Sequence, residues 1–282
     1  MTFFSFKPAF EFSIPQVADL LTRGFEGYFV PINITAAVLL TMMRRDSIDL
    51  SESRILYKDD QPVGVALIAR RGWTSRLAAM GIISDARNGG AGTWAMQQLI
   101  DEARMRGDHE MLLEVIEQNT AGVKLYQKVG FKIVRRLVGY KLENPGITQA
   151  AGEGGDEKEL QQIDIQEFAG MVIQYGLPDL PWQLSAVTLA QHTPPSQVFR
   201  LNDAYCLISN PQAEHVSISS VLIKPNETGT GSGAALMRAL FARFPNKTWH
   251  VPAIYPEETT ALFDQLGMQR EGISQWQMSR RL

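Results

Sequence analysis

The chain has 282 residues, 45% of them hydrophobic and 20% charged, a composition typical of soluble globular proteins and a length that fits two domains. The net charge of −3 at pH 7 comes without a strongly basic stretch, which argues against nucleic acid as a partner. There is no signal-peptide pattern and no apolar run of about 20 residues, and the single cysteine, Cys206, excludes an internal disulfide, so we expect a cytoplasmic protein that does not enter a membrane.

The first half of the chain reads as alternating strands and helices, the order of an α/β or α+β layer fold. Apolar periodicity and turn residues predict two early helices, a run of strands, a helix after a glycine-rich loop, a short strand, a short helix and a final strand region. In chain order these elements are expected at 17–25, 34–45, 54–58, 63–70, 76–83, 94–106, 111–116, 120–129 and 131–142. Gly107 and Gly130 are expected to stop the last two helices, and Asn119 to cap the second of them.

The sequence contains a long internal repeat. A stretch rich in Gly, Ala and acidic residues, 146–159, is expected to be a linker. On both sides of it a glycine-rich loop precedes an apolar helix, and a short helix that ends at a glycine comes later. The loops are RNGGAG (87–92) and TGTGSG (228–233), and the later segments are LYQKVGF (125–131) and LFDQLGM (262–268). We therefore expect a duplicated domain, at 1–145 and at 160–282.

The first glycine-rich loop has the composition of an anion-binding loop. Its glycines let a ligand approach the backbone, and the helix that follows offers free N–H groups and the positive end of its dipole. A Walker A loop is excluded because no Lys follows the glycines, whereas Gly90, Gly92 and Ala95 formally fit the dinucleotide pattern G-x-G-x-x-A. The polar stretch and the several strands before the loop argue against a dinucleotide. Arg87, Gly90 and Gly92 also satisfy the pattern R-x-x-G-x-G.

A second segment, LLEVIEQNTAGVKLYQKVGF at 112–131, follows downstream. Taken with R-x-x-G-x-G, it resembles the GNAT superfamily of N-acetyltransferases, with Gly122 standing where the family usually has another small residue. The resemblance covers about residues 1–143 and is most specific over 80–131. It implies an α/β (α+β) fold of two GNAT-like domains, each a mostly antiparallel mixed sheet flanked by helices, with acetyl-CoA as cofactor and CoA as product.

The resemblance assigns the chemistry to two residues of this segment. Tyr126 matches the tyrosine that lies near the thioester sulfur and acts as general acid, or as a hydrogen-bond donor to the departing thiolate. Glu114 matches the base of the family members that acetylate ribosomal-protein N-termini, and partial removal from water would make it a better base. A core tyrosine and a solvent-facing acid are the alternatives. The preceding strand has no acid to replace Glu114, and the absence of a cysteine in this half favours direct attack in a ternary complex.

The family also holds its cofactor through the backbone of the central strand and through the loop. Carried over to this sequence, the cofactor-binding residues are Ile82, Ile83, Arg87, Asn88, Gly89, Gly90, Ala91, Gly92, Thr93 and Asn119. A plain helix cap explains Asn119 equally well. The four histidines lack the spacing of metal ligands, so no metal is expected.

The second copy lacks the candidate proton-transfer groups. Aligning the late segments places Val251 opposite Glu114 and Phe263 opposite Tyr126, and Thr228 replaces the loop arginine. We therefore expect a degenerate, catalytically silent domain that packs against the first or lends surface to it.

The sequence predicts transfer of an acetyl or short acyl group from acyl-CoA to a primary amine of a small molecule, peptide or protein. The alternative is a non-catalytic acyl-CoA-binding sensor. Phe25, Tyr28 and Phe29 lie where the family builds its acceptor wall, although core packing explains these aromatics equally well. The identity of the acceptor stays open, and a homodimer is one possible assembly.

Overall fold

The computed structural model describes residues 3–145, 160–225 and 229–282. The chain groups into two compact units: unit 1 is Met1–Arg135 with Trp276–Leu282, and unit 2 is Arg136–Gln275. The sequence predicts two continuous domains and does not foresee this exchange of end segments. The expected linker at 146–159 lies outside the described residues, as does Thr228.

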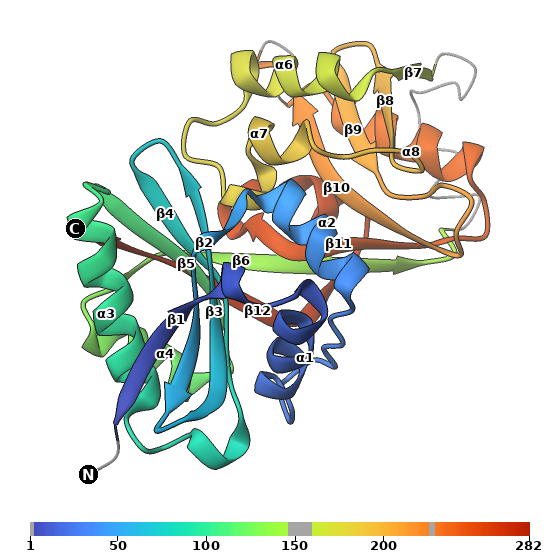
Figure 1. Ribbon diagram of the computed structural model, residues 1–282. Coiled ribbons are helices and arrows are strands. Elements are labelled where there is room, and N and C mark those ends of the chain that lie inside the picture. Colours follow the sequence, from blue (N-terminus) through green and yellow to red (C-terminus); the bar gives the residue numbers. More distant parts are fainter. Residues whose placement is uncertain (1–2, 146–159, 226–228) are drawn as a thin grey trace. The chain divides into compact units, whose positions relative to one another are not determined.

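Unit 1 is built on a sheet whose first four strands pair antiparallel and whose fifth runs parallel to the fourth. The strands are β1 Phe4–Pro8, β2 Ile48–Lys58, β3 Gln61–Arg71, β4 Thr74–Ile82 and β5 Glu110–Ile116. The helices are α1 Ile14–Gly24, α2 Ala36–Asp46, α3 Ala91–Met105 and α4 Thr120–Lys128, with 3-10 turns η1 Ala9–Glu11 and η2 Ser84–Ala86. In Figure 1, α1 and α2 cover one face of this sheet and α3 and α4 cover the other.

The sequence explains the two-sided burial. Residues 63–69 of β3 are all buried, as expected of a central strand that has helices on both faces. α1 starts three residues earlier than its apolar periodicity predicts because Ser13 and Gln16 form a capping box, in which the Gln16 side chain accepts from the Ser13 N–H at 2.9 Å. Pro15 stands in the first turn, where a missing N–H costs nothing.

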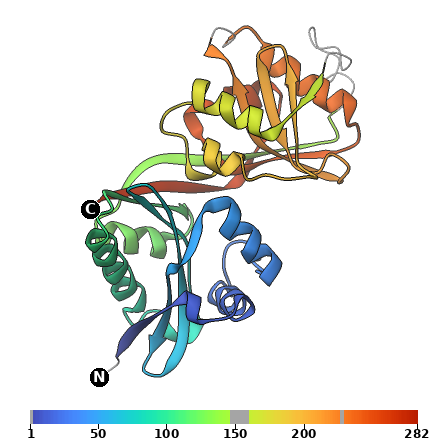
Figure 2. The same cartoon turned by 45° about the horizontal axis from the view of Figure 1, so that its top comes forward.

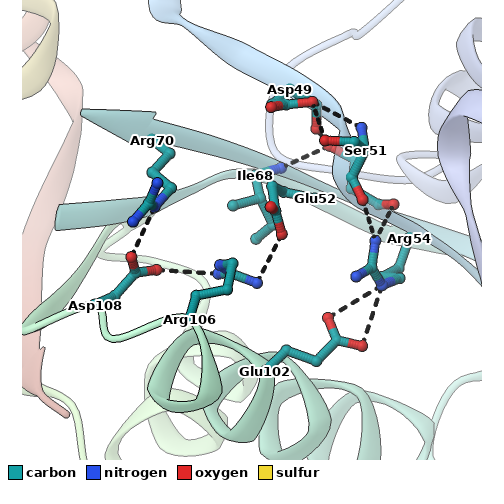
Figure 3. Close-up of polar contacts among 10 residues, drawn as sticks. Asp49, Ser51, Glu52, Arg54, Ile68, Arg70, Glu102, Arg106 and Asp108 are labelled. Atoms are coloured by element: carbon teal, nitrogen blue, oxygen red, sulfur yellow. Dashed lines mark hydrogen bonds and ion pairs between the residues drawn. The ribbon is translucent and has the colours of Figure 1, made fainter. Parts of the chain in front are cut away.

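A network of partly buried ion pairs lies between the sheet of unit 1 and the end of α3 (Figure 3). The Asp108 carboxylate, whose side chain has no exposed surface, accepts from Arg70 at 2.8 Å and from Arg106 at 3.1 Å. Arg106 also reaches Glu52 of β2 at 2.8 Å. The network therefore joins β2 and β3 to the turn between α3 and β5.

The edge of β5 is completed from the other end of the chain. β12 (Gln269–Arg281) is the next strand after β5, and its part from Trp276 onward belongs to unit 1. Met278 is fully buried among apolar side chains of α3, α4 and β5. The Leu282 N–H donates to the His109 carbonyl at 3.0 Å.

Unit 2 repeats the arrangement of unit 1, with four antiparallel strands, a fifth strand parallel to the fourth, and β6 antiparallel to the fifth. Its strands are β7 Gln161–Ile163, β8 Gln197–Leu201, β9 Ala204–Ile208, β10 His215–Ile223, β11 Thr248–Pro256 and the part of β6 (Lys132–Glu143) from Arg136 onward. Its helical segments are α6 Ile165–Tyr175, η4 Trp182–Leu184, α7 Ala186–Leu189, α8 Ser232–Arg243, η6 Glu257–Thr259 and α9 Ala261–Gln265.

The core of unit 2 follows the alternation of its central strand. Cys206 of β9 packs in the cluster that contains Met237 of α8, whereas its neighbours Tyr205 and Leu207 pack in the cluster that contains Phe168 of α6. Helices therefore cover both faces, as Figure 2 shows for α6 and α8. The predicted fold class, a mostly antiparallel mixed sheet flanked by helices in each domain, is confirmed. Of the helices in the described ranges, none is long and apolar enough to cross a membrane.

Candidate active site

The central feature of unit 1 is the separation of β4 from β5. The two strands pair only from Thr74 opposite Glu110 to Leu77 opposite Leu113, although β4 continues to Ile82 and β5 to Ile116. On its other side β4 carries a bulge, because the partners of Leu67 and Ile68 on β3 are Ala79 and Leu77, which leaves Ala78 as an extra residue. The backbone of β4 beyond Ala78 therefore has no ladder partner on the β5 side. A ligand that carries amide groups could pair with that edge.

The glycine-rich loop follows this strand after the 3-10 turn η2. Asn88 and Gly90 both adopt left-handed conformations, with φ of 63° and 85°. Gly90 precedes α3, and the first bond of the helix runs from the Trp94 N–H to the Gly90 carbonyl at 3.0 Å. The N–H groups of Ala91, Gly92 and Thr93 come before that bond, so they are the groups that a helix start offers to an anion.

The Arg87 side chain is hydrogen-bonded to backbone carbonyls and does not extend freely over the loop. Its guanidinium donates to the carbonyls of Ile82 at 2.7 Å, Gly24 at 2.9 Å and Glu26 at 3.0 Å. It therefore ties the end of β4 to the end of α1. With the side chain bonded in this way, the backbone N–H groups of the loop are the first candidates for a phosphate contact.

The two strand residues expected to bind cofactor are placed at the end of β4. Ile82 is opposite Gly64 of β3, and the Ile83 N–H donates to the Val63 carbonyl at 2.9 Å. Both isoleucine side chains pack against a cluster that includes Ala91 of α3. The end of β4, the loop and the start of α3 are therefore held together by packing.

Glu114 forms a buried ion pair that the sequence does not reveal. Its Oε2 lies 2.6 Å from one Arg76 terminal nitrogen and 2.8 Å from Arg76 Nε, and the two side chains are 3% and 7% exposed. Glu114 Oε1 is buried and has no hydrogen-bond partner among the described residues. The alternative interpretation, in which the Glu114 side chain faces solvent, is therefore wrong. One carboxylate oxygen is bound by Arg76, and the other has no hydrogen-bond partner among the described residues.

Tyr126, on α4, is buried on the opposite side of the sheet. Leu113 and Val115 pack in the same apolar cluster as Tyr126, and the alternation of β5 turns Glu114 to the other face. The Tyr126 ring meets Phe131 edge-on at 6.1 Å. Burial raises the pKa of the Tyr126 phenol, and nearby Tyr28 adds to the rise, so the hydroxyl stays a neutral donor at ordinary pH.

Asn119 and Tyr28 meet at the turn between β5 and α4. Asn119 caps α4, since its side-chain oxygen accepts from the Gly122 N–H at 3.0 Å. A Cβ on Gly122 would lie 2.6 Å from the Asn119 amide, which explains glycine at that position. The Tyr28 hydroxyl bonds to the Asn119 side chain and to the Ile116 backbone, while burial raises the pKa of Tyr28. Tyr28 therefore lies near Tyr126. The aromatic run at 25–29 is the feature of the sequence that points to Tyr28.

The comparisons with known proteins identify one segment of the chain and support the fold of the whole. Residues 18–131 match the model of the acetyltransferase (GNAT) family. This segment is a GNAT acetyltransferase domain. No curated protein shows significant similarity to the sequence.

Three solved structures show the same fold over nearly the whole chain. A GCN5-related N-acetyltransferase from Sphaerobacter thermophilus has a TM-score of 0.70 at 15% identity, covering 99% of this chain and 95% of its own. A tandem GNAT protein from the clavulanic acid biosynthesis pathway has a TM-score of 0.67 at 12% identity, covering 100% and 98%. A GCN5-related N-acetyltransferase from Anabaena variabilis has a TM-score of 0.67 at 15% identity, covering 99% and 72%. At these identities the likeness concerns the fold.

The equivalent positions in unit 2 are apolar. Val251 and Phe263 have 0% and 1% of their surface exposed and pack in one core cluster. The second loop nevertheless keeps the shape of the first, with φ of 85° at Gly229 and 90° at Gly231, the residue before α8. Among the described residues, no group of three or more His, Cys, Asp or Glu could hold a metal ion.

Proposed function

We propose that the chain transfers an acetyl or short acyl group from acyl-CoA to a primary amine, by direct attack of the amine in a ternary complex at the unit 1 site. The observation that carries the proposal is the separation of β4 from β5 next to a left-handed glycine loop at the start of α3. An unpaired strand edge suits the amides of a pantetheine arm, and the helix start suits a pyrophosphate. Acetyl-CoA carries both.

In this proposal the backbone of the loop and of β4 binds the cofactor. The N–H groups of Ala91, Gly92 and Thr93 face the pyrophosphate, with Asn88, Gly89 and Gly90 shaping the loop. Ile82 and Ile83 present the strand edge to the pantetheine amides. Arg87 keeps the loop attached to α1 through its three carbonyl contacts.

Two side chains on opposite faces of the sheet move the protons. Tyr126 donates a hydrogen bond, or its proton, to the departing thiolate, and its raised pKa keeps the phenol neutral for that role. Glu114 accepts the proton of the amine through Oε1, because Oε2 is bound to Arg76. Cys206 takes no part, since it is buried in unit 2 and burial raises the pKa of its thiol.

The acceptor is an amine of a small molecule or peptide, and its wall is formed by the loop that follows α1. Tyr28 of that loop bonds to Asn119, so this loop borders the turn before Tyr126. Phe29, half-exposed at 49%, continues the same aromatic run. A partly exposed aromatic wall favours acceptors with an apolar part beside the amine.

The decisive experiment measures free CoA release from acetyl-CoA with a panel of amines and peptide N-termini. We expect turnover with at least one amine, and a loss of most of that turnover in Tyr126→Phe. Binding of acetyl-CoA with no CoA release for any amine would favour the sensor instead. The Arg76–Glu114 ion pair is the observation that favours the sensor hypothesis. A carboxylate bound by an arginine already has a hydrogen-bond partner when no substrate is present.

A further inference from the structure

The last strand of unit 1 carries a buried amide side chain whose oxygen has no hydrogen-bond partner. Gln277 lies on β12, in the part of that strand that belongs to unit 1, and it is 6% exposed. Its Oε1 is buried and accepts no hydrogen bond within the described residues. A buried amide oxygen without a donor disfavours folding, which suggests that Gln277 serves a ligand instead.

The register of the strands places Gln277 opposite Glu114. β12 is the next strand after β5, and the Leu282 N–H donates to the His109 carbonyl at 3.0 Å. The end of β12 therefore meets the start of β5, and the two strands run antiparallel. Counting five residues back along β12 and five residues forward along β5 from this bond brings Gln277 opposite Glu114.

The packing of the neighbouring residues puts both side chains on one face of the sheet. Met278 and Leu113 pack in the same apolar cluster as Tyr126. Since side chains alternate along a strand, Gln277 and Glu114 both lie on the opposite face. Residues directly opposite each other in antiparallel strands have Cβ atoms about 4.5–5.5 Å apart. Glu114 and Gln277 therefore present two neighbouring Oε1 atoms, both buried and both without a partner among the described residues.

These two oxygens border the separation of β4 from β5. The last pair of the two strands is Leu77 opposite Leu113, so Glu114 is the first residue of β5 beyond that pair. Arg76 binds only Oε2 of Glu114 and leaves Oε1 to a ligand. Two adjacent acceptor oxygens fit a ligand atom that carries two hydrogens. The nitrogen of a neutral primary amine carries two hydrogens, whereas that of a neutral secondary amine carries one.

We propose that Gln277 is a specificity-determining residue of the acyl-transfer site and that it selects primary over secondary amines. This inference rests on the acyl transfer proposed for unit 1. One N–H of the acceptor amine donates to Glu114 Oε1, and the other donates to the Gln277 amide oxygen. The nitrogen lone pair is then free to attack the carbonyl carbon of the thioester.

This arrangement accounts for both hydrogens of the amine. As the C–N bond forms and the C–S bond breaks, one proton passes from the nitrogen to Glu114, and the thiolate leaves with a hydrogen bond or a proton from Tyr126. The second hydrogen stays on the product amide and keeps its bond to Gln277. A secondary amine gives its single hydrogen to Glu114, so the Gln277 oxygen is left buried without a donor in the transition state.

The test compares one amine with its N-methyl derivative on the full chain. The probe is the primary amine of the panel that has the highest turnover. In the wild type, kcat/KM should favour it over the N-methyl derivative by at least about tenfold, because the derivative leaves one buried acceptor unpaired. Gln277→Met keeps the size of the side chain and removes the acceptor, so it should remove about tenfold of that preference. Any steric effect of the methyl group is present in both proteins and cancels in the comparison.

The control is Gln127→Met, the same substitution at an exposed position of α4, which should leave the preference unchanged. An unchanged preference in an active Gln277→Met enzyme would overturn the inference and leave the proposed acyl transfer intact. A wild type that turns over no amine would overturn the proposed function, and the inference with it.

Urea unfolding separates a role in specificity from a role in folding. Because Gln277 Oε1 is unpartnered among the described residues, Gln277→Met should unfold at the same urea concentration as the wild type or at a higher one. A lower midpoint together with an intact preference for the primary amine would show that the amide serves folding, and would refute the assignment.

Discussion

The Arg76 guanidinium and the Glu114 carboxylate form an ion pair at 2.6 Å in which both side chains are more than nine-tenths buried. The parallel pairing of β4 and β5 creates it: Arg76 is opposite Leu112, and Glu114 stands two residues further along β5 on the same face. Both Arg76 contacts use Oε2, which leaves Oε1 buried and unpartnered among the described residues. One carboxylate therefore combines a structural anchor with a free acceptor at the place where the two strands separate.

Glu114→Gln is expected to lower both activity and stability. The variant removes the proposed base, so kcat should fall most at low pH, where the amine is hardest to deprotonate. It also leaves Arg76 buried without a counter-charge, which costs about 3–5 kcal/mol in the free energy of unfolding. Urea unfolding and a pH–rate profile measure the two effects on one protein.

The control for Glu114 is a double variant in which both charges are removed. Arg76→Met with Glu114→Leu should recover most of the stability, since a buried ion pair can be replaced by packed apolar groups at little cost. It should not recover turnover. If the double variant is stable and fully active, Glu114 is an anchor and some other group accepts the proton.

Tyr126→Phe is expected to reduce kcat about 100-fold with little change in the KM for acetyl-CoA. The hydroxyl acts on charge that develops on the thiolate, so its loss affects the transition state more than cofactor binding. Since Phe131 and other apolar side chains surround the ring, phenylalanine should pack there without loss of folding. Steady-state kinetics with an acceptor known to turn over provides the measurement.

The pH dependence of the same enzyme checks the state of the tyrosine. Because burial raises the pKa of Tyr126, its ionisation should not limit kcat at any pH up to about 10. An alkaline decline of kcat that disappears in Tyr126→Phe would mean that the tyrosine titrates within that range.

Asp108 is expected to make the stability of the protein depend on acid pH. Burial opposes its ionisation, but hydrogen bonds from Arg70 and Arg106 outweigh burial and lower the pKa of the Asp108 carboxyl (Figure 3). A lowered pKa in the folded state adds stability above the unfolded pKa of about 4, and that stability is lost as the pH falls through the folded pKa. The free energy of unfolding should therefore decline below about pH 4.

Two variants isolate this contribution. Asp108→Asn should unfold more easily at pH 7 and show a shallower decline on acidification, because the group that binds a proton on unfolding is gone. Asp101→Asn removes an acid whose ion pair with Arg104 is exposed, with side chains 47% and 43% accessible, and it should change the free energy by no more than about 1 kcal/mol. Equal pH slopes for wild type and Asp108→Asn would contradict the assignment.

Much of the site follows from local sequence. The loop glycines, the helix that starts at Ala91 and the cap at Asn119 depend on residues within a few positions of each other, and local rules therefore place them well. The predicted helix at 94–106 begins three residues late because a left-handed Gly90 allows α3 to start without a side-chain cap.

The other features of the site depend on contacts between segments that are distant in the sequence. A single sequence does not reveal those contacts. The Arg76–Glu114 pair needs the register of two parallel strands, and the bonds from Arg87 to Gly24 and Glu26 need α1 to end beside β4. Strand periodicity assigns Glu114 correctly to the face of Leu112, yet it cannot tell that an arginine covers that face. The sequence also does not reveal the exchange of end segments between the two units, because the final strand of either repeat could complete either sheet.

Residues Trp276–Leu282 are expected to be necessary for acyl transfer although they include none of the site residues that the sequence predicts. Their part of β12 is the strand beside β5, and Met278 fills the core under α3 and α4. A fragment of residues 1–145 should therefore fold poorly and show little turnover, despite carrying Tyr126, Glu114 and the glycine loop. Circular dichroism, thermal unfolding and CoA release measure folding and activity together.

Point variants in the full chain test the same idea without removing a strand. Met278→Ala should lower the free energy of unfolding by about 2–5 kcal/mol, the usual cost of emptying a fully buried methionine site, and should lower activity in proportion to the folded fraction. Arg281→Ala, at an exposed position of the same strand, serves as the matched control and should leave both unchanged. A stable 1–145 fragment with full turnover would show that unit 1 closes its sheet without β12, for instance with the strand that follows α4 in its own half of the sequence.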